Sequence, residues 1–95
     1  MRFLSVLLVA LLVMPLLVAQ GGNKADDRIY DEVRRKLADD ADVKGAGFDV
    51  IVKDGAVILR GRVHTAKAKE KAEKMTKKVK GVTTVTNELK LFGEP

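Results

Sequence analysis

Lysine is the residue type in this 95-residue chain whose number and spacing could do chemistry. Residues 60–80 hold nine basic side chains and two acidic ones, whereas acids outnumber bases in residues 26–54. A patch of one charge sign points either to an anionic partner or to a solvated face. Each lysine close to an anionic bilayer contributes about 1 kcal/mol of binding free energy. Four of the lysines follow the spacing of one helix face: Lys67, Lys71, Lys74 and Lys78.

The alternative for this segment is a helix that is merely soluble. Glu70 lies four residues before Lys74, which predicts a stabilising ion pair on the helix surface. Nucleic acid is a poor fit as the anion, because few aromatic side chains follow the first 21 residues to stack on bases. These aromatic residues are Tyr30, Phe48 and Phe92. We therefore weigh a lipid-facing helix against a solvated one and expect no nucleic-acid partner.

Nucleophiles and metal ligands are sparse in the sequence. There is no cysteine, His64 is the single histidine, and the one serine, Ser5, lies in the apolar N-terminal run. A lone histidine without a neighbouring nucleophile makes no catalytic dyad. Residues 40–45 begin like a calcium-binding EF-hand loop, but Lys44 and Ile51 occupy two positions that need oxygen ligands. We predict neither an enzyme nor a cofactor or metal site.

The first 21 residues have the layout of a secretory signal peptide. A basic residue precedes an apolar run over residues 3–18, and small residues follow it. Cleavage is expected after Ala19 or after Gly21. The alternative is an uncleaved inner-membrane anchor, but a spanning helix needs roughly 20 apolar residues, and this run is shorter and contains Pro15. The sequence thus predicts an exported protein.

The remaining residues are enough for one domain. We expect a flexible leader over residues 22–26 and a single domain over residues 27–92. A domain of this size buries a limited core, so a deep cavity would compete with the core for apolar side chains. This size favours a binding module over an enzyme and gives no reason to expect a small-molecule substrate.

The first element expected is an amphipathic helix over residues 27–38. Asp26 and Asp27 supply cap oxygens and favourable charge at its start. Apolar residues recur at every fourth position, which is the period of one buried helix face. These residues are Ile29, Val33 and Leu37.

A two-residue hairpin is the strongest local signal in the chain. Asp54 and Gly55 separate two alternating segments, and both tolerate the positive φ angles of a type I′ turn. This turn predicts that Phe48 lies opposite Gly61, where the missing side chain leaves room for the ring. The same register places Val50 opposite Leu59 and Val52 opposite Val57.

The other face of the hairpin is nominally wet but carries Ile51 opposite Ile58. β-Propensity alone explains such a pair, and so does cover by a membrane or a neighbouring molecule. On the same face Asp49 lies opposite Arg60, which predicts a cross-strand ion pair of small value.

A second helix is expected over residues 66–80, capped by Thr65 and stopped by Gly81 in the left-handed conformation. A strand over residues 84–91 follows it. The element order α-β-β-α-β predicts an α+β fold, with two helices packed on one face of a three-stranded mixed sheet. The expected buried residues are Ala68, Ala72, Met75 and Val79 of the helix and Val85, Leu89 and Leu91 of the strand.

Two segments resemble the motifs of a known family. Residues 55–63 read Gly-Ala-Val-Ile-Leu-Arg-Gly-Arg-Val and are similar to the G-x-V-x-L-x-G-x-V core of the BON domain. Residues 81–89 read Gly-Val-Thr-Thr-Val-Thr-Asn-Glu-Leu and resemble its closing G-V-x-x-V-x-N-x-L. The family is named after osmotically inducible periplasmic proteins and nodulation proteins. The resemblance covers residues 27–91, nearly all of the expected domain.

The resemblance implies an α+β domain of the cell envelope, with a proposed role in binding phospholipid membranes and without catalytic activity. Gly55 and Gly61 match backbone positions of the motif, and Asn87 matches a residue that forms local hydrogen bonds. We therefore expect a periplasmic module that binds anionic phospholipid reversibly through the four lysines together with Ile51 and Ile58. The alternative is a protein-interaction or chaperone-like envelope stress protein that uses the isoleucine face.

Overall fold

Helix α2, Lys24–Asp39, is the first element of the computed structural model, which describes residues 24–95. The three apolar residues predicted to form its buried stripe are almost completely buried: Ile29, Val33 and Leu37. None of the helices in the described residues is long and apolar enough to span a membrane. The predicted signal peptide over residues 1–21 lies outside the described residues.

The helix begins three residues earlier than predicted, so residues 24–26 of the expected leader are helical. The reason is the position of Asp26, which lies in the first turn instead of capping it. Its carboxylate accepts hydrogen bonds from the backbone N–H groups of Asp54 at 2.7 Å and Gly55 at 3.0 Å. The start of α2 is therefore tied to the hairpin turn, a tertiary contact that a local pattern does not reveal.

Strands β1, Asp49–Lys53, and β2, Ala56–Val63, form the predicted antiparallel hairpin. Asp54 has φ 51° and Gly55 has φ 82°, as a type I′ turn requires. The register places Val50 opposite Leu59 and Ile51 opposite Ile58, so the predicted pairing is confirmed. A short 3₁₀ helix, η1 (Gly45–Gly47), precedes β1.

Helix α3, Ala66–Lys77, begins as predicted, with the Thr65 hydroxyl oxygen accepting the N–H of Ala68 at 3.0 Å. It ends three residues earlier than predicted. The N–H groups of Lys78 and Val79 bond to carbonyls only three residues back, which tightens the last turn and buries Val79. Gly81, with φ 95°, therefore turns the chain towards the next strand and does not cap the helix.

Thr76, not Met75, completes the buried stripe of α3. Met75 is half-buried, whereas the Thr76 hydroxyl is buried and donates a hydrogen bond to the Ala72 carbonyl at 2.8 Å. A threonine can occupy this apolar face because its one polar group is satisfied within its own helix. Ala68 and Ala72 fill the rest of the stripe as predicted, and these small residues allow close packing on the sheet.

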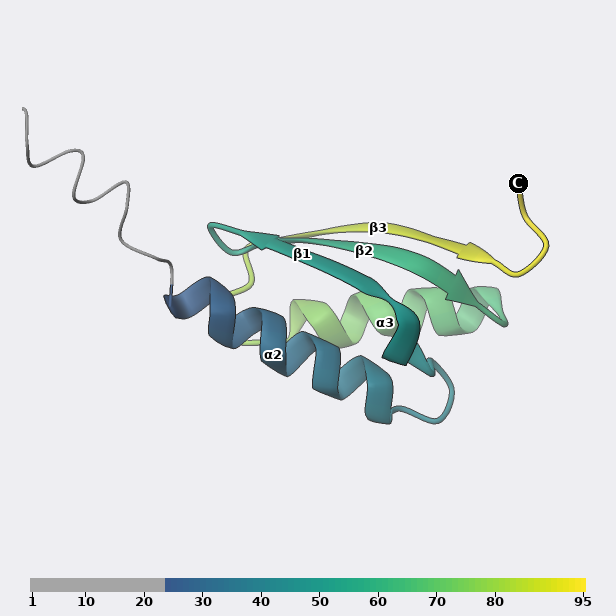
Figure 1. Ribbon diagram of the computed structural model, residues 1–95, viewed down its shortest axis with the longest axis horizontal. Helices are drawn as coiled ribbons and strands as arrows, with labels where there is room; N and C mark the ends of the chain where they lie inside the picture. Colours follow the sequence, from purple (N-terminus) through teal and green to yellow (C-terminus); the bar gives the residue numbers. More distant parts are fainter. Residues whose placement is uncertain (1–23) are drawn as a thin grey trace, which may run out of the picture.

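Strand β3, Thr84–Leu91, pairs in parallel with β2 and completes a sheet of order β1-β2-β3. Both helices cover one face of the sheet, while the opposite face has no helix over it (Figure 1). The α+β class, the order of elements and the mixed three-stranded sheet are thus confirmed. We call the face without helices the open face.

The contact of Phe48 with Gly61 is confirmed and holds the start of the hairpin against the core. A Cβ atom built on Gly61 would lie 2.7 Å from Cδ1 of Phe48. Gly61 also has φ 149°, a conformation that residues with side chains rarely adopt.

We expect Gly61→Ala to lower the free energy of unfolding by about 3 kcal/mol, because the methyl group adds both backbone strain and a clash with a buried ring. Gly47→Ala is the matched control: nothing lies within 4 Å of its Cβ position. Its stability should change by less than about 1 kcal/mol. Urea denaturation followed by circular dichroism measures both variants, and equal midpoints would contradict the packing argument.

Candidate functional site

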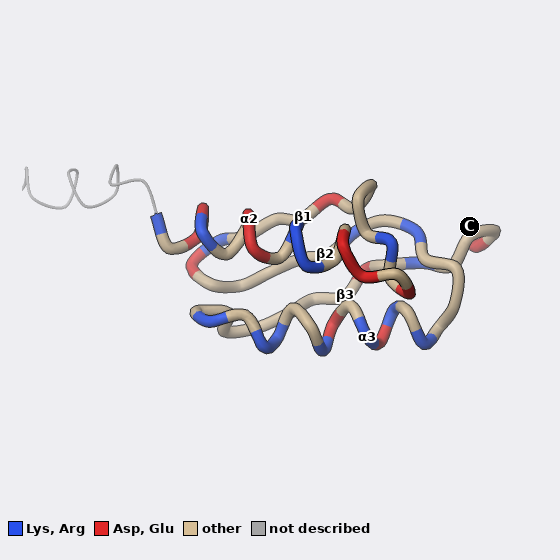
Figure 2. Tube along the Cα trace, turned by 90° about the horizontal axis from the view of Figure 1, so that it is seen from below, with Lys and Arg blue, Asp and Glu red and all other residues tan. Residues whose placement is uncertain are grey.

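Helix α3 is the basic element of the domain. It carries five basic and two acidic residues, whereas α2 carries five of each. Figure 2 shows basic positions recurring along α3, while both signs occur along α2. Lys67, Lys74 and Lys78 lie exposed on the outward side of α3 and its C-terminal cap, and none of them forms an ion pair within residues 24–95. We call these three lysines the basic face.

Lys71, the fourth lysine of the predicted row, is already paired. Its ammonium lies 2.7 Å from the Asp42 carboxylate and 3.0 Å from that of Asp40. The hydrogen bond to Asp42, followed by the one to Asp40, raises the pKa of Lys71 above its ordinary value. A lysine held between two carboxylates offers little charge to an outside anion. The structure therefore separates Lys71 from the basic face.

The turn after α2 explains why the two acids are in place. One oxygen of Asp40 accepts the N–H groups of Asp42 at 2.9 Å and Val43 at 3.1 Å, which makes a local Asx turn. The hydrogen bond from Lys71, followed by that from Val43, holds the pKa of the Asp40 carboxyl below its ordinary value of 3.8. The segment that resembles the start of a calcium loop is thus a turn that anchors a lysine.

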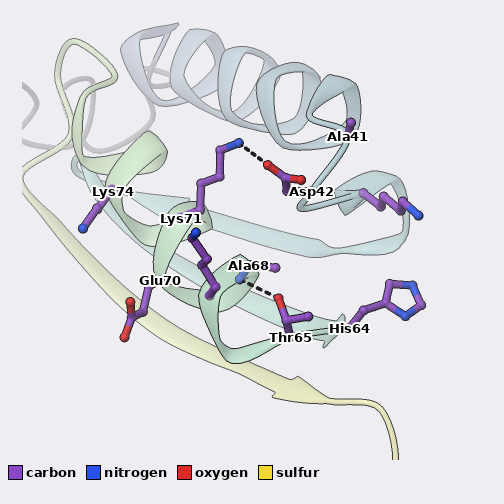
Figure 3. Close-up of a pocket in the computed structure, with 10 residues that line it drawn as sticks. Ala41, Asp42, His64, Thr65, Ala68, Glu70, Lys71 and Lys74 are labelled. Carbon is purple, nitrogen blue, oxygen red and sulfur yellow. Dashed lines mark hydrogen bonds and ion pairs between the residues drawn. The ribbon is translucent and has the colours of Figure 1, made fainter.

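An open groove of about 590 Å³ lies between this turn and the N-terminal half of α3. Lysines 44, 67, 71 and 74 line it, together with Asp42 and Glu70. Figure 3 shows Lys71 reaching across towards Asp42, while Glu70 and Lys74 point away from that loop. The basic face therefore borders a groove whose opposite wall adds a further lysine, Lys44.

The groove contains His64 and Thr65, but their contacts serve the fold. The Thr65 oxygen caps α3, and the His64 ring packs on Phe92 with ring centroids 4.7 Å apart. Among residues 24–95 no cluster of three or more His, Asp or Glu side chains is arranged to hold a metal ion. The chemistry that the groove offers is attraction of an anion.

Ile51 and Ile58, the apolar pair of the predicted contact surface, lie on the open face. Ile51 is 41% exposed and Ile58 is half-buried. The helices pack on the other face (Figure 1), and Lys67, Lys74 and Lys78 are exposed on α3 and its C-terminal cap. The isoleucines and the basic face are thus on opposite sides of the domain. One flat membrane surface cannot contact both, so the structure does not bring the predicted residues into one site.

Two predicted ion pairs are replaced by others. The Arg60 guanidinium pairs with Glu88 of β3 at 2.7 Å instead of with Asp49, although both acids are its direct neighbours on the adjacent strands. In α3 the pair is Glu73 with Lys77 at 2.8 Å, not Glu70 with Lys74. Because Glu70 and Lys74 do not pair within the described structure, the charge of Lys74 remains available on the basic face.

The residues predicted for turns and packing have structural roles. The Asn87 side chain donates to the Lys69 carbonyl of α3 at 2.9 Å and accepts the N–H of Leu89 at 3.1 Å. A Cβ atom on Gly55 would lie 2.7 Å from the Gly81 carbonyl oxygen, so the hairpin turn and the turn before β3 touch through glycines. These residues position α3 against the sheet.

A two-layer domain with a basic helix on one side defines a small binding module. The chain belongs to the BON domain family, whose model matches residues 25–91. This is a family of binding modules known for phospholipid binding in the cell envelope, not a family of enzymes. A comparison with curated proteins found no match.

The ion pair of Lys71 predicts how the protein responds to acid. The pKa of Asp40 is lowered in the folded state, so the unfolded state binds more protons in acid. The stability that this carboxylate contributes is present above its ordinary pKa and is lost as the pH falls through the folded pKa. Asp40→Asn keeps an oxygen for the turn but removes the charge. The urea midpoint of this variant should fall less steeply on acidification and meet that of the unmodified protein in strong acid.

Asp31→Asn is the matched control, because this residue of α2 is exposed and makes no ion pair within the described residues. Its midpoint should follow the unmodified protein through the acid range. Parallel curves for Asp40→Asn and the unmodified protein would contradict the assignment.

Proposed function

We propose that the protein is an exported cell-envelope module that associates reversibly with anionic phospholipid surfaces through the basic face of α3. The observation that carries the proposal is that Lys67, Lys74 and Lys78 point outward together without acidic partners in residues 24–95, in a domain of the BON family. The predicted signal peptide supports a periplasmic location.

The expected attraction is electrostatic and moderate. Each lysine near an anionic bilayer contributes about 1 kcal/mol, so the basic face supplies on the order of 3 kcal/mol. Salt screens such exposed charges, so binding should weaken as ionic strength rises. Lys71 adds little because Asp40 and Asp42 hold it, and Lys44 across the groove can contribute if a headgroup enters there.

A protein-interaction module is the second candidate, and one observation favours it. Ile51 is a large apolar side chain that remains 41% exposed beside Ile58 on the open face. A protein partner covering this pair would bind mainly through apolar burial and would respond little to salt. The two candidates use opposite sides of the domain, so variants on each side distinguish them.

We expect the double variant Lys67→Gln/Lys74→Gln to bind anionic vesicles roughly 30-fold more weakly than the unmodified protein, because two contributions of about 1 kcal/mol are removed. Co-sedimentation with vesicles of phosphatidylglycerol and phosphatidylethanolamine, at low and at physiological salt, measures this change. Vesicles of phosphatidylcholine alone should bind none of the proteins.

The matched control removes the same charge from the open face. Arg62→Gln/Lys90→Gln changes two exposed basic residues on that side of the sheet, away from β1. This variant should bind nearly as well as the unmodified protein. Equal losses in the two double variants would show that net charge, and not the basic face, drives binding. If the unmodified protein stays in the supernatant at low salt, direct lipid binding is ruled out.

A further inference from the structure

The outer edge of β1 has backbone groups that no other part of the described structure uses. In a two-residue hairpin the pair that flanks the turn, Lys53 with Ala56, is hydrogen-bonded, and bonded pairs alternate along the ladder. Val50 and Val52 therefore direct their N–H and carbonyl groups away from β2. The Phe48 carbonyl follows the same direction and accepts a hydrogen bond from Arg34 at 2.9 Å. Within residues 24–95, the outward N–H and carbonyl groups of Val50 and Val52 form no hydrogen bond to another backbone group or to a side chain.

The C-terminal half of the opposite edge, on β3, is blocked by the chain itself. The outward N–H of Leu89 on β3 is taken by the Asn87 side chain at 3.1 Å. The outward N–H of Leu91 is taken by the Glu94 carboxylate, also at 3.1 Å. Side chains that occupy backbone donors in this way protect an edge strand from pairing with another chain. The contrast favours β1 as the edge that accepts a strand, because no side chain of the described residues takes the outward N–H groups of Val50 and Val52.

The sequence of β1 is complementary to itself when read in the antiparallel direction. It reads Asp49-Val50-Ile51-Val52-Lys53, with opposite charges at equal distances from Ile51. An antiparallel copy centred on Ile51 places Asp49 opposite Lys53 of the second copy. It also places Val50 opposite Val52, the two residues whose backbone groups point outward. Charge and hydrogen-bond pattern therefore agree on one register.

We infer that two copies of the chain pair antiparallel along β1, about a two-fold axis at Ile51, and join their sheets into one. The open face already has a row of alternating charge, Glu88–Arg60–Asp49, across its three strands. Lys53 of the second copy continues that row. Ile51 likewise meets Ile51 of the second copy, so the exposed isoleucine gains an apolar neighbour. Opposite charges and apolar pairs directly across strands both stabilise a ladder.

The two-fold axis stands perpendicular to the joined sheet, so both helix layers lie on the same side. The basic faces of the two copies then point in the same direction. When one copy binds a membrane, the basic face of the other copy is held close to it at a high effective concentration. This consequence rests on the proposed function, but the pairing itself does not. A single strand pair of five residues is a small interface, so the association is expected to be weak and concentration-dependent.

Charge exchange on β1 tests the pairing without lipid. Sedimentation velocity is run on the protein recovered from cells that express the full 95-residue sequence, at concentrations up to millimolar. The unmodified protein should shift from monomer to dimer. Lys53→Asp places acids opposite acids, and Asp49→Lys places lysines opposite lysines, so each variant alone should stay monomeric. An equimolar mixture of the two should form a heterodimer, and the double variant Asp49→Lys/Lys53→Asp should dimerise again.

Arg35→Asp is the control, because it makes the same change in charge at an exposed position of α2, away from β1. It should dimerise like the unmodified protein. Urea midpoints confirm that each variant is folded, and the mixture and the double variant keep the test decisive if a single variant is destabilised. A protein that remains monomeric at all concentrations, or a dimer that both single exchanges leave intact, overturns the inference. Vesicle binding is not part of this readout, so failure here leaves the lipid proposal standing.

Discussion

Burial of one face of a three-stranded sheet is the constraint on which the rest of the structure depends. Strand side chains alternate, so placing Val57, Leu59 and Val63 under the helices commits their neighbours to the open face. The nearly complete burial of Ala68 and Ala72 keeps α3 against this face. Lys67, Lys74 and Lys78 are consequently exposed on the outer side of α3 and its C-terminal cap. The domain therefore has two surfaces of different chemistry on opposite sides: the basic face of α3, and the open face of the sheet with its isoleucine pair.

The loop between α2 and β1 then refines the basic surface. Asp40 turns the chain and, with Asp42, takes Lys71 out of a row of four similar lysines. The other three lysines of that row, Lys67, Lys74 and Lys78, form no ion pair in the described structure. A lipid surface can meet them without any change in the domain, while the free edge of β1 lies elsewhere. Membrane contact and self-pairing can therefore occur together.

Local patterns were sufficient for much of this fold. Asp54-Gly55 and the alternation around it predicted the hairpin register, and the two motifs predicted the family. Tertiary contacts were not predictable in the same way. Lys71 meets acids about 30 positions away along the chain, and no periodicity connects them. The helical periodicity likewise allows either Met75 or Thr76 to be buried. Thr76 can be the buried residue because its hydroxyl donates a hydrogen bond to the Ala72 carbonyl, and this bond cannot be predicted from the periodicity.

If the basic face contacts the membrane, the domain must bind with α3 towards the bilayer and the open face towards water. The chain contains no cysteine, so single cysteines at Lys78 and at Ile51 can each carry an environment-sensitive fluorophore. On anionic vesicles, we expect a blue shift and an intensity gain for the label at position 78 and little change for the label at position 51. A response at position 51 with none at position 78 would rule out this orientation and would assign membrane contact to the open face.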